Sequence, residues 1–151
     1  MLTIEDVRRD AAVIEYRQEV HVAAQNAILA SDLLVEQPRI LCVDDSEDIL
    51  QLLTDVLECA GYDVVTSSDP NEALGVCLSG DFDLIVVDND MPGLSGLELA
   101  RMVKREMPYV PVLMFSGGVL TEADKLDVAA VVPKGAGADR LLSAIGEGLS
   151  G

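Results

Sequence analysis

Short apolar runs alternate with amphipathic segments along most of this chain, from Arg39 to Leu149. The runs are rich in β-branched residues, as parallel strands buried on both faces are, and the segments between them repeat apolar residues at helical spacing. The pattern predicts an α/β fold, a doubly wound, five-stranded parallel sheet with a helix after each strand. The strands are expected at about residues 39–44, 63–67, 83–88, 110–116 and 129–132.

The expected helices carry start signals of different strength. Pro70 suits a first helical turn, and Ser95 with Glu98 three residues later forms a capping-box pattern. Before the fifth strand the signal is weak, because Thr121 with Asp124 caps two turns at most. The residues expected on the buried faces of the first two helices are Ile49, Leu52, Leu53, Val56, Leu57, Ala60, Ala73, Leu74, Cys77 and Leu78.

Charge and hydropathy narrow the class of protein. The 27 acidic and 10 basic residues give a formal net charge of −17, and such a surface repels nucleic-acid backbones and anionic lipids. No apolar stretch reaches the ~18 uncharged residues of a membrane span, and the N-terminus lacks a secretion signal. Cys42, Cys59 and Cys77 lie in apolar-patterned segments without metal-ligand spacing, as reduced thiols do. We expect a cytoplasmic protein that binds neither nucleic acid nor membrane.

Chemically reactive side chains stand at the ends of four expected strands. Asp44 and Asp45 end the first run, Asp88 ends the third, Ser116 ends the fourth and Lys134 follows the fifth. The carboxyl ends of neighbouring parallel strands line a common crevice, so these side chains can converge there. Converging carboxylates repel one another unless a cation or a proton joins them. Carboxylates, a hard metal ion, a hydroxyl and a lysine together suggest phosphoryl chemistry.

The order of these residues, with Asp88 inside DNDMPGLSG, resembles the response-regulator receiver domain of bacterial two-component signalling. The resemblance runs from Arg39 to about Leu149, and we assign the receiver domain to residues 38–151. It implies a flavodoxin-like sheet of strand order 2-1-3-4-5. It also implies a phosphorylation-dependent switch that accepts a phosphoryl group from a sensor histidine kinase or a phosphotransfer protein.

The resemblance also implies a role for each residue. Asp88 would attack the phosphorus and become the phosphorylated residue. Mg²⁺, or Mn²⁺, would be bound directly by Asp45 and Asp88, by the main-chain carbonyl of Asp90, and by Asp44 through water. The side chains that would contact phosphoryl oxygens are Ser116 and Lys134. Beyond transfer to Asp88 and slow autodephosphorylation, no independent metabolic activity is expected.

The chain departs from the family pattern around Lys134. Val131 stands where many receivers have an aromatic residue whose rotation reports phosphorylation. Pro133 precedes the lysine, whereas the family lysine is usually followed by a proline in a cis bond. Few residues separate Ser116 from Lys134, so we expect the fourth helix to be short or partly unwound.

Other readings remain open for the same residues. The acidic pair could cap a helix, the acids after the third strand could be loop residues, and the hydroxyl and the lysine could be ordinary surface groups. A haloacid-dehalogenase-type phosphatase also combines Asp-x-Asp, a hydroxyl, a lysine and an acid pair. In that family, however, the pair comes last, and this chain has no sequence for a cap domain. A receiver-like interaction module that is not phosphorylated is the third alternative.

Residues 1–37 lie outside the resemblance. Thr3 with Asp6 resembles a capping box, and apolar residues recur at heptad spacing from Val13 to Leu34, which predicts a long amphipathic helix. Its apolar stripe needs a partner, which is the domain itself, a second chain or another protein; we favour a homodimer. No effector domain follows Leu149, so we expect a stand-alone receiver whose output passes through a downstream protein partner.

Overall fold

A computed structural model describes residues 17–20, which are helical, and residues 37–151. The rest of the expected N-terminal helix lies outside the described residues. The strands are β1 (Arg39–Val43), β2 (Asp63–Ser67), β3 (Leu84–Val87), β4 (Val112–Ser116) and β5 (Ala130–Pro133). The α-helices in the second range are α2 (Glu47–Cys59), α3 (Pro70–Ser79), α4 (Gly96–Glu106) and α5 (Ala138–Ser150).

The five strands form one parallel sheet in the order β2-β1-β3-β4-β5, which confirms the predicted fold and strand order. The register aligns the ends of the two central strands, because Val43 of β1 is the partner of Val87 of β3. The residue that follows β3, Asp88, donates its backbone N–H to the carbonyl oxygen of Val43 at 2.9 Å. The register therefore places Asp44 and Asp88 side by side at the carboxyl edge of the sheet.

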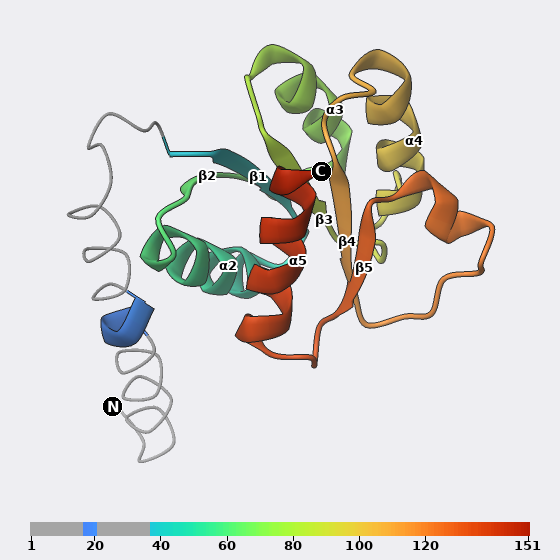
Figure 1. Ribbon diagram of the computed structural model, residues 1–151. Coiled ribbons are helices and arrows are strands. Elements are labelled where there is room, and N and C mark those ends of the chain that lie inside the picture. The colour runs from blue at the N-terminus through green and yellow to red at the C-terminus, as the bar shows by residue number, and fades with distance from the viewer. Residues whose placement is uncertain (1–16, 21–36) are drawn as a thin grey trace, which may run out of the picture.

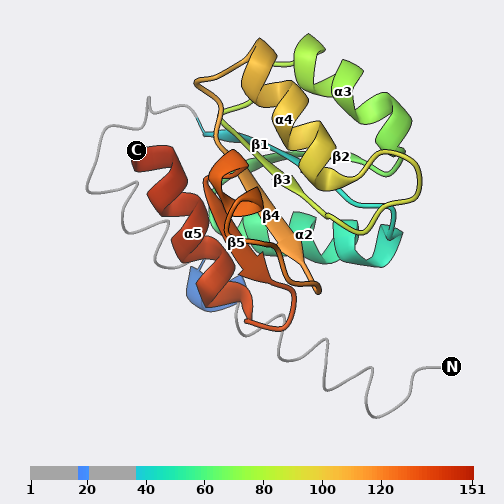
Figure 2. The same cartoon turned by 90° about the vertical axis from the view of Figure 1, so that its right-hand side faces the viewer.

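Helices cover both faces of the sheet (Figures 1 and 2). One face packs against α2 and α5, and the other packs against α3 and α4. All four residues of β3 are buried, as expected of a central parallel strand. Each face has its own apolar cluster; the helical residues in them include Leu50, Leu53, Leu57, Leu141 and Ile145 on one side and Ala73, Cys77, Leu99 and Val103 on the other.

Two leucines that the periodicity placed in the core lie at the surface. Leu52 of α2 is 45% exposed and Leu78 of α3 is 47% exposed. The apolar residues of both helices cover a wider arc than the sheet can bury, so the helix rotation chosen by packing decides which ones face the core. In α2 this rotation buries Leu50, which we had not assigned to the core.

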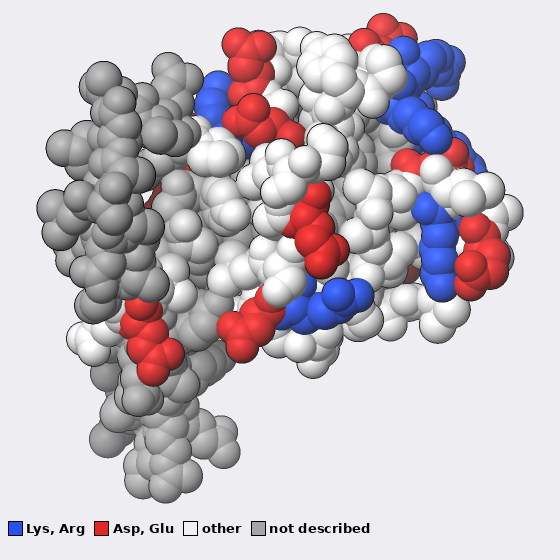
Figure 3. Space-filling view, in the orientation of Figure 1, with Lys and Arg blue, Asp and Glu red and all other residues white. Residues whose placement is uncertain are grey.

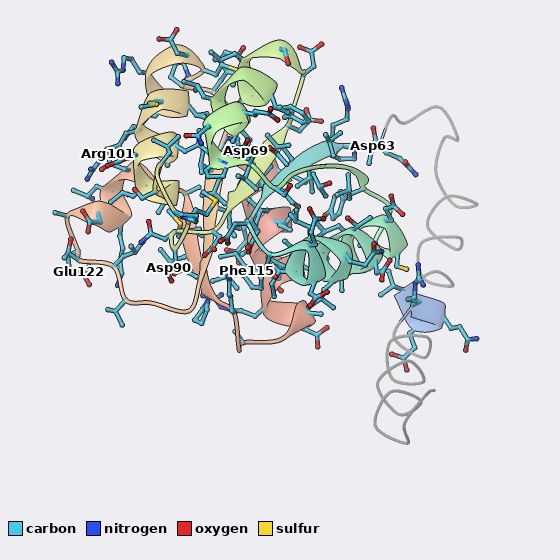
Figure 4. All side chains as sticks on the ribbon, turned by 180° about the vertical axis from the view of Figure 1, so that it is seen from behind. Asp63, Asp69, Asp90, Arg101, Phe115 and Glu122 are labelled. Carbon is cyan, nitrogen blue, oxygen red and sulfur yellow. The ribbon has the colours of Figure 1, made fainter. Side chains whose placement is uncertain are left out.

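Between β4 and β5 the helix that we expected to be short or partly unwound is reduced to a single turn. This segment contains a single 3-10 turn, η1 (Asp124–Asp127), and the Oγ1 of the preceding Thr121 accepts from the Asp124 N–H at 3.1 Å. Arg101 of α4, labelled in Figure 4, forms ion pairs with this turn, because its guanidinium nitrogens lie 3.3 Å from Asp124 Oδ1 and 2.8 Å from Asp127 Oδ2. In Figure 3 the Lys and Arg side chains visible over α4 and η1 have acidic neighbours, in line with these ion pairs. The connection is short, and ion pairs with Arg101 hold η1 against α4.

Candidate functional site

Three carboxylates meet at the carboxyl edge of the sheet. Asp44 follows β1 and is 1% exposed, Asp88 follows β3 and is 2% exposed, and Asp45 is exposed beside them. One carboxylate oxygen from each residue lies within 4.8 Å of those of the other two. Figure 4 shows Asp90 at this end of the sheet and Asp63, the first residue of β2, at the opposite end. The predicted convergence of the strand-end acids is therefore present in the fold.

Lys134 reaches into this cluster from the end of β5. Its Nζ lies 3.2 Å from Asp44 Oδ2 and 3.3 Å from Asp88 Oδ1. Although partial burial alone would lower it, the pKa of Lys134 is raised by the charges of Asp44 and Asp88. Pro133 precedes the lysine, and every peptide bond of the described residues is trans. The unusual sequence around Lys134 thus still delivers its ammonium group to the carboxylates.

Burial raises the pKa of Asp44 above the usual range, and the Asp88 carboxylate adds to this effect. The hydrogen bond from the Ser46 N–H to Asp44 Oδ1, at 2.9 Å, and the charge of Lys134 act in the opposite direction. Within the described part of the chain, Asp44 Oδ2 is buried without a hydrogen bond and has only the ion pair with Lys134. A buried carboxylate oxygen in this state is suited to a further cation.

The local hydrogen bonds decide between the alternatives for the acidic pair. Ser46 is the N-cap of α2, and its Oγ accepts from the Ile49 N–H at 3.3 Å. Because Ser46 caps the start of α2, helix capping does not explain why two aspartates stand at positions 44 and 45. Their position at the end of a central strand instead leaves both carboxylates available for a ligand.

Ser116 at the end of β4 and Asp90 in the loop after β3 border the cluster. Ser116 is buried at the end of β4, where its Oγ accepts from the Gly118 N–H at 3.1 Å. A hydroxyl that accepts such a bond can still donate its own hydrogen. Asp90 is exposed, and its N–H donates to Asp88 Oδ1 at 3.1 Å. The Asp90 side chain is outside the three-carboxylate cluster, whereas the predicted metal contact of this residue uses its main-chain carbonyl.

Gly96 belongs to the site although the sequence analysis did not single it out. A Cβ at this position would overlap the carbonyl oxygen of Asp88 and come within 3.0 Å of the Asn89 Cα. The N-terminus of α4 therefore touches the backbone that carries Asp88. Asn89 strengthens this contact, since its Oδ1 accepts from the Leu97 N–H at 3.1 Å. The only signal in the sequence was the glycine content of MPGLSG, which reads equally well as a turn.

The donor set fits a hard divalent cation. Carboxylate oxygens are the ligands that Mg²⁺ prefers, and three of them converge here with one oxygen that lacks a hydrogen bond. A cation would also reduce the repulsion between the two buried carboxylates, which Lys134 and the N–H groups of Ser46 and Asp90 now offset in part. Asp44, Asp45 and Asp88 could hold such an ion.

Comparison with known proteins assigns this arrangement to a family. A profile of the response regulator receiver domain matches residues 40–146. The chain belongs to the response regulator receiver domain family. This receiver domain carries its acid pair before the third strand, which separates it from the haloacid-dehalogenase-type alternative.

Several known proteins are similar to this receiver domain. The alkaline phosphatase synthesis transcriptional regulatory protein PhoP of Bacillus subtilis is 42% identical over 78 residues, which is 52% of this chain and 32% of PhoP. The response regulator TrrA of Thermotoga maritima, solved in complex with Mg²⁺-BeF, has a TM-score of 0.71 at 29% identity over 74% of this chain and 98% of TrrA. TrrA in complex with the histidine kinase ThkA has a TM-score of 0.70 at 30% identity over 75% of this chain and 99% of TrrA. The chain thus spans about a third of the length of PhoP.

No helix in residues 17–20 or 37–151 is long and apolar enough to cross a bilayer.

Proposed function

We propose that this receiver domain is a signalling switch that accepts a phosphoryl group on Asp88 in the presence of Mg²⁺ or Mn²⁺. The observation that carries the proposal is the contact of Lys134 with both Asp44 and Asp88 inside a cluster of three carboxylates. The match to the receiver family and the likeness to TrrA, solved with Mg²⁺-BeF, support it. A receiver-like module without phosphorylation would have no need of buried, mutually repelling acids.

In the proposed reaction an Asp88 oxygen attacks the phosphorus of a phosphohistidine. The new O–P bond forms an acyl phosphate, and the P–N bond breaks as the imidazole leaves with the bonding electrons. The metal ion supplies charge neutralisation between the carboxylate and the phosphoryl oxygens. Lys134, 3.3 Å from Asp88 Oδ1, pairs with one phosphoryl oxygen, and the Ser116 hydroxyl donates a hydrogen bond to another.

The test is to incubate the full chain with a small phosphodonor. With Mg²⁺ we expect the mass to increase by one phosphoryl group, which hydroxylamine removes because the product is an acyl phosphate. With EDTA in place of Mg²⁺ we expect no increase. A chain that keeps its mass with Mg²⁺ and donor, or a product that hydroxylamine does not cleave, would contradict the proposal.

We further propose different roles for the two acids that follow β1. Asp45 is exposed and makes a direct ligand, whereas Asp44 is buried against Lys134 and acts through water. Asp45→Asn is therefore expected to weaken Mg²⁺ binding more than Asp44→Asn, for which we expect a loss of about tenfold, as for an indirect ligand. Calorimetric titration with Mg²⁺ measures both. Equal losses would reject this division of roles while leaving the site in place.

We propose a sensor histidine kinase or a phosphotransfer protein as the phosphodonor and a protein as the downstream partner. The complex of TrrA with the kinase ThkA supports the proposal of a kinase as phosphodonor.

We propose residues 38–151 as the receiver unit in the cytoplasm and residues 1–37 as a helical extension. The acidic surface, with its net charge of −17, supports a role without nucleic acid or anionic membrane.

A further inference from the structure

The outer side of α2 has an unfavourable charge pattern at its C-terminal end. The helix contains four acidic residues and no basic one, and two of the acids, Asp55 and Glu58, lie near its end. The carbonyl end of a helix already carries a partial negative charge, so acids at this end are destabilising and a nearby cation is stabilising. The sequence of α2 provides no such cation.

Arg17 supplies a cation from outside the helix. Its Nε donates to the Sγ of Cys59 at 2.9 Å, and its terminal nitrogen lies 3.8 Å from Asp55 Oδ1. Cys59 is the last residue of α2, so the guanidinium lies at the end of the helix where the charge pattern calls for it. In Figure 1 the segment 17–20, drawn in blue, lies beside this end of α2.

The burial pattern of the segment agrees with a docked helix turn. Arg17 and Val20 are partly buried, whereas Gln18 and Glu19 between them are exposed. Residues three apart share one face of a helix, so this pattern means that one face of the segment is covered.

The surface of α2 offers a matching row of side chains. Asp48, Leu52, Asp55 and Cys59 follow one another at spacings of four, three and four residues and therefore share a face. Leu52, the apolar member of this row, is 45% exposed. The acids of this face fit a segment that presents a cation, as Arg17 does, whereas Leu52 stays exposed with the segment in place.

We propose that this outer face of α2 is the docking surface for the N-terminal segment of the same chain, with Arg17 as the anchor. The inference does not depend on phosphorylation of Asp88. A separate protein that binds this face of α2 must displace the segment first.

Hydrogen exchange on the full chain tests the proposal. In Arg17→Ala we expect the amides of residues 17–20 to exchange several-fold faster than in the wild type, because the anchoring contacts are lost. Alanine has the higher helix propensity, so faster exchange cannot result from a weaker intrinsic helix. The matched control is Gln18→Ala, which changes an exposed neighbour and should leave the exchange rates as they are. Exchanging the two charges, in Arg17→Asp combined with Asp55→Arg, should restore part of the protection.

Two results would overturn the inference. The first is an exchange rate at residues 17–20 that is the same in Arg17→Ala and in the wild type. The second is protection of these residues that rises with protein concentration while light scattering reports a dimer, because the segment would then dock on a second copy. Protection that is independent of concentration and lost in Arg17→Ala supports docking within one chain.

Discussion

Asp88→Asn is expected to lose phosphoryl acceptance completely. The amide has nearly the volume of the carboxylate, so the buried position, 2% exposed, keeps its packing. Its oxygen is a far weaker nucleophile than a carboxylate oxygen, and the variant also removes the negative charge that Asp88 places beside Lys134. Mass spectrometry after incubation with a small phosphodonor and Mg²⁺ should show no added phosphoryl group.

The matched control for this variant is Asp81→Asn. Asp81 is exposed in the turn before β3, at the opposite end of that strand, so its charge does not act on the cluster. The Asp81→Asn protein should accept one phosphoryl group, as the wild type does. If Asp88→Asn is labelled to the same extent as Asp81→Asn, another residue is the acceptor and the assignment of Asp88 fails.

Gly96→Ala is expected to have the second largest effect, although it adds only a methyl group. The new Cβ would overlap the carbonyl oxygen of Asp88, so either α4 or the backbone after β3 must move. Overpacking of this kind costs about 1–3 kcal/mol of unfolding free energy. Because the displaced backbone carries Asp88, we also expect the rate of phosphorylation to fall. Denaturant unfolding and the phosphodonor assay measure the two effects.

Gly75→Ala is the matched control for this substitution. Gly75 lies within α3, is exposed, and has no atom within 4 Å of the position of a Cβ. Alanine is a better helix former than glycine, so this variant should gain about 0.5–1 kcal/mol in unfolding free energy. A Gly96→Ala protein that is as stable and as readily phosphorylated as the wild type would show that the contact between α4 and Asp88 has no role.

Most of the candidate site could be predicted from the sequence because it depends on strand ends. Once β1, β3, β4 and β5 are recognised as parallel neighbours, the residue after each strand must lie at the same edge of the sheet. Asp44, Asp88 and Lys134 follow their strands directly, and Ser116 is the last residue of β4. The contribution of Gly96 could not be predicted, because the approach of α4 to the Asp88 backbone follows from how the helix packs and not from local sequence pattern.

The sequence predicted a short or partly unwound helix between β4 and β5, but it did not predict how short that helix is. Thr121 Oγ1 does accept from the Asp124 N–H, but a capping pattern in the sequence states only where a helix can begin. The length of the helix depends on the space between the strand ends and on the ion pairs of Arg101 with η1, which join residues far apart in the chain. Local sequence carries no information on such partners.

By itself the sequence determined the class of fold, the order of its elements and the set of reactive residues, because hydrophobic period and strand-end position are local properties of the chain. Tertiary structure alone decided which face of α2 is buried, leaving Leu52 exposed, and brought Arg17 to Asp55 and Cys59. It also placed Lys134 between Asp44 and Asp88 at distances that allow ion pairs. These outcomes depend on which apolar surfaces are buried against one another when the chain folds, and on charges that come into contact only in the folded protein. No local pattern in the chain therefore specifies them.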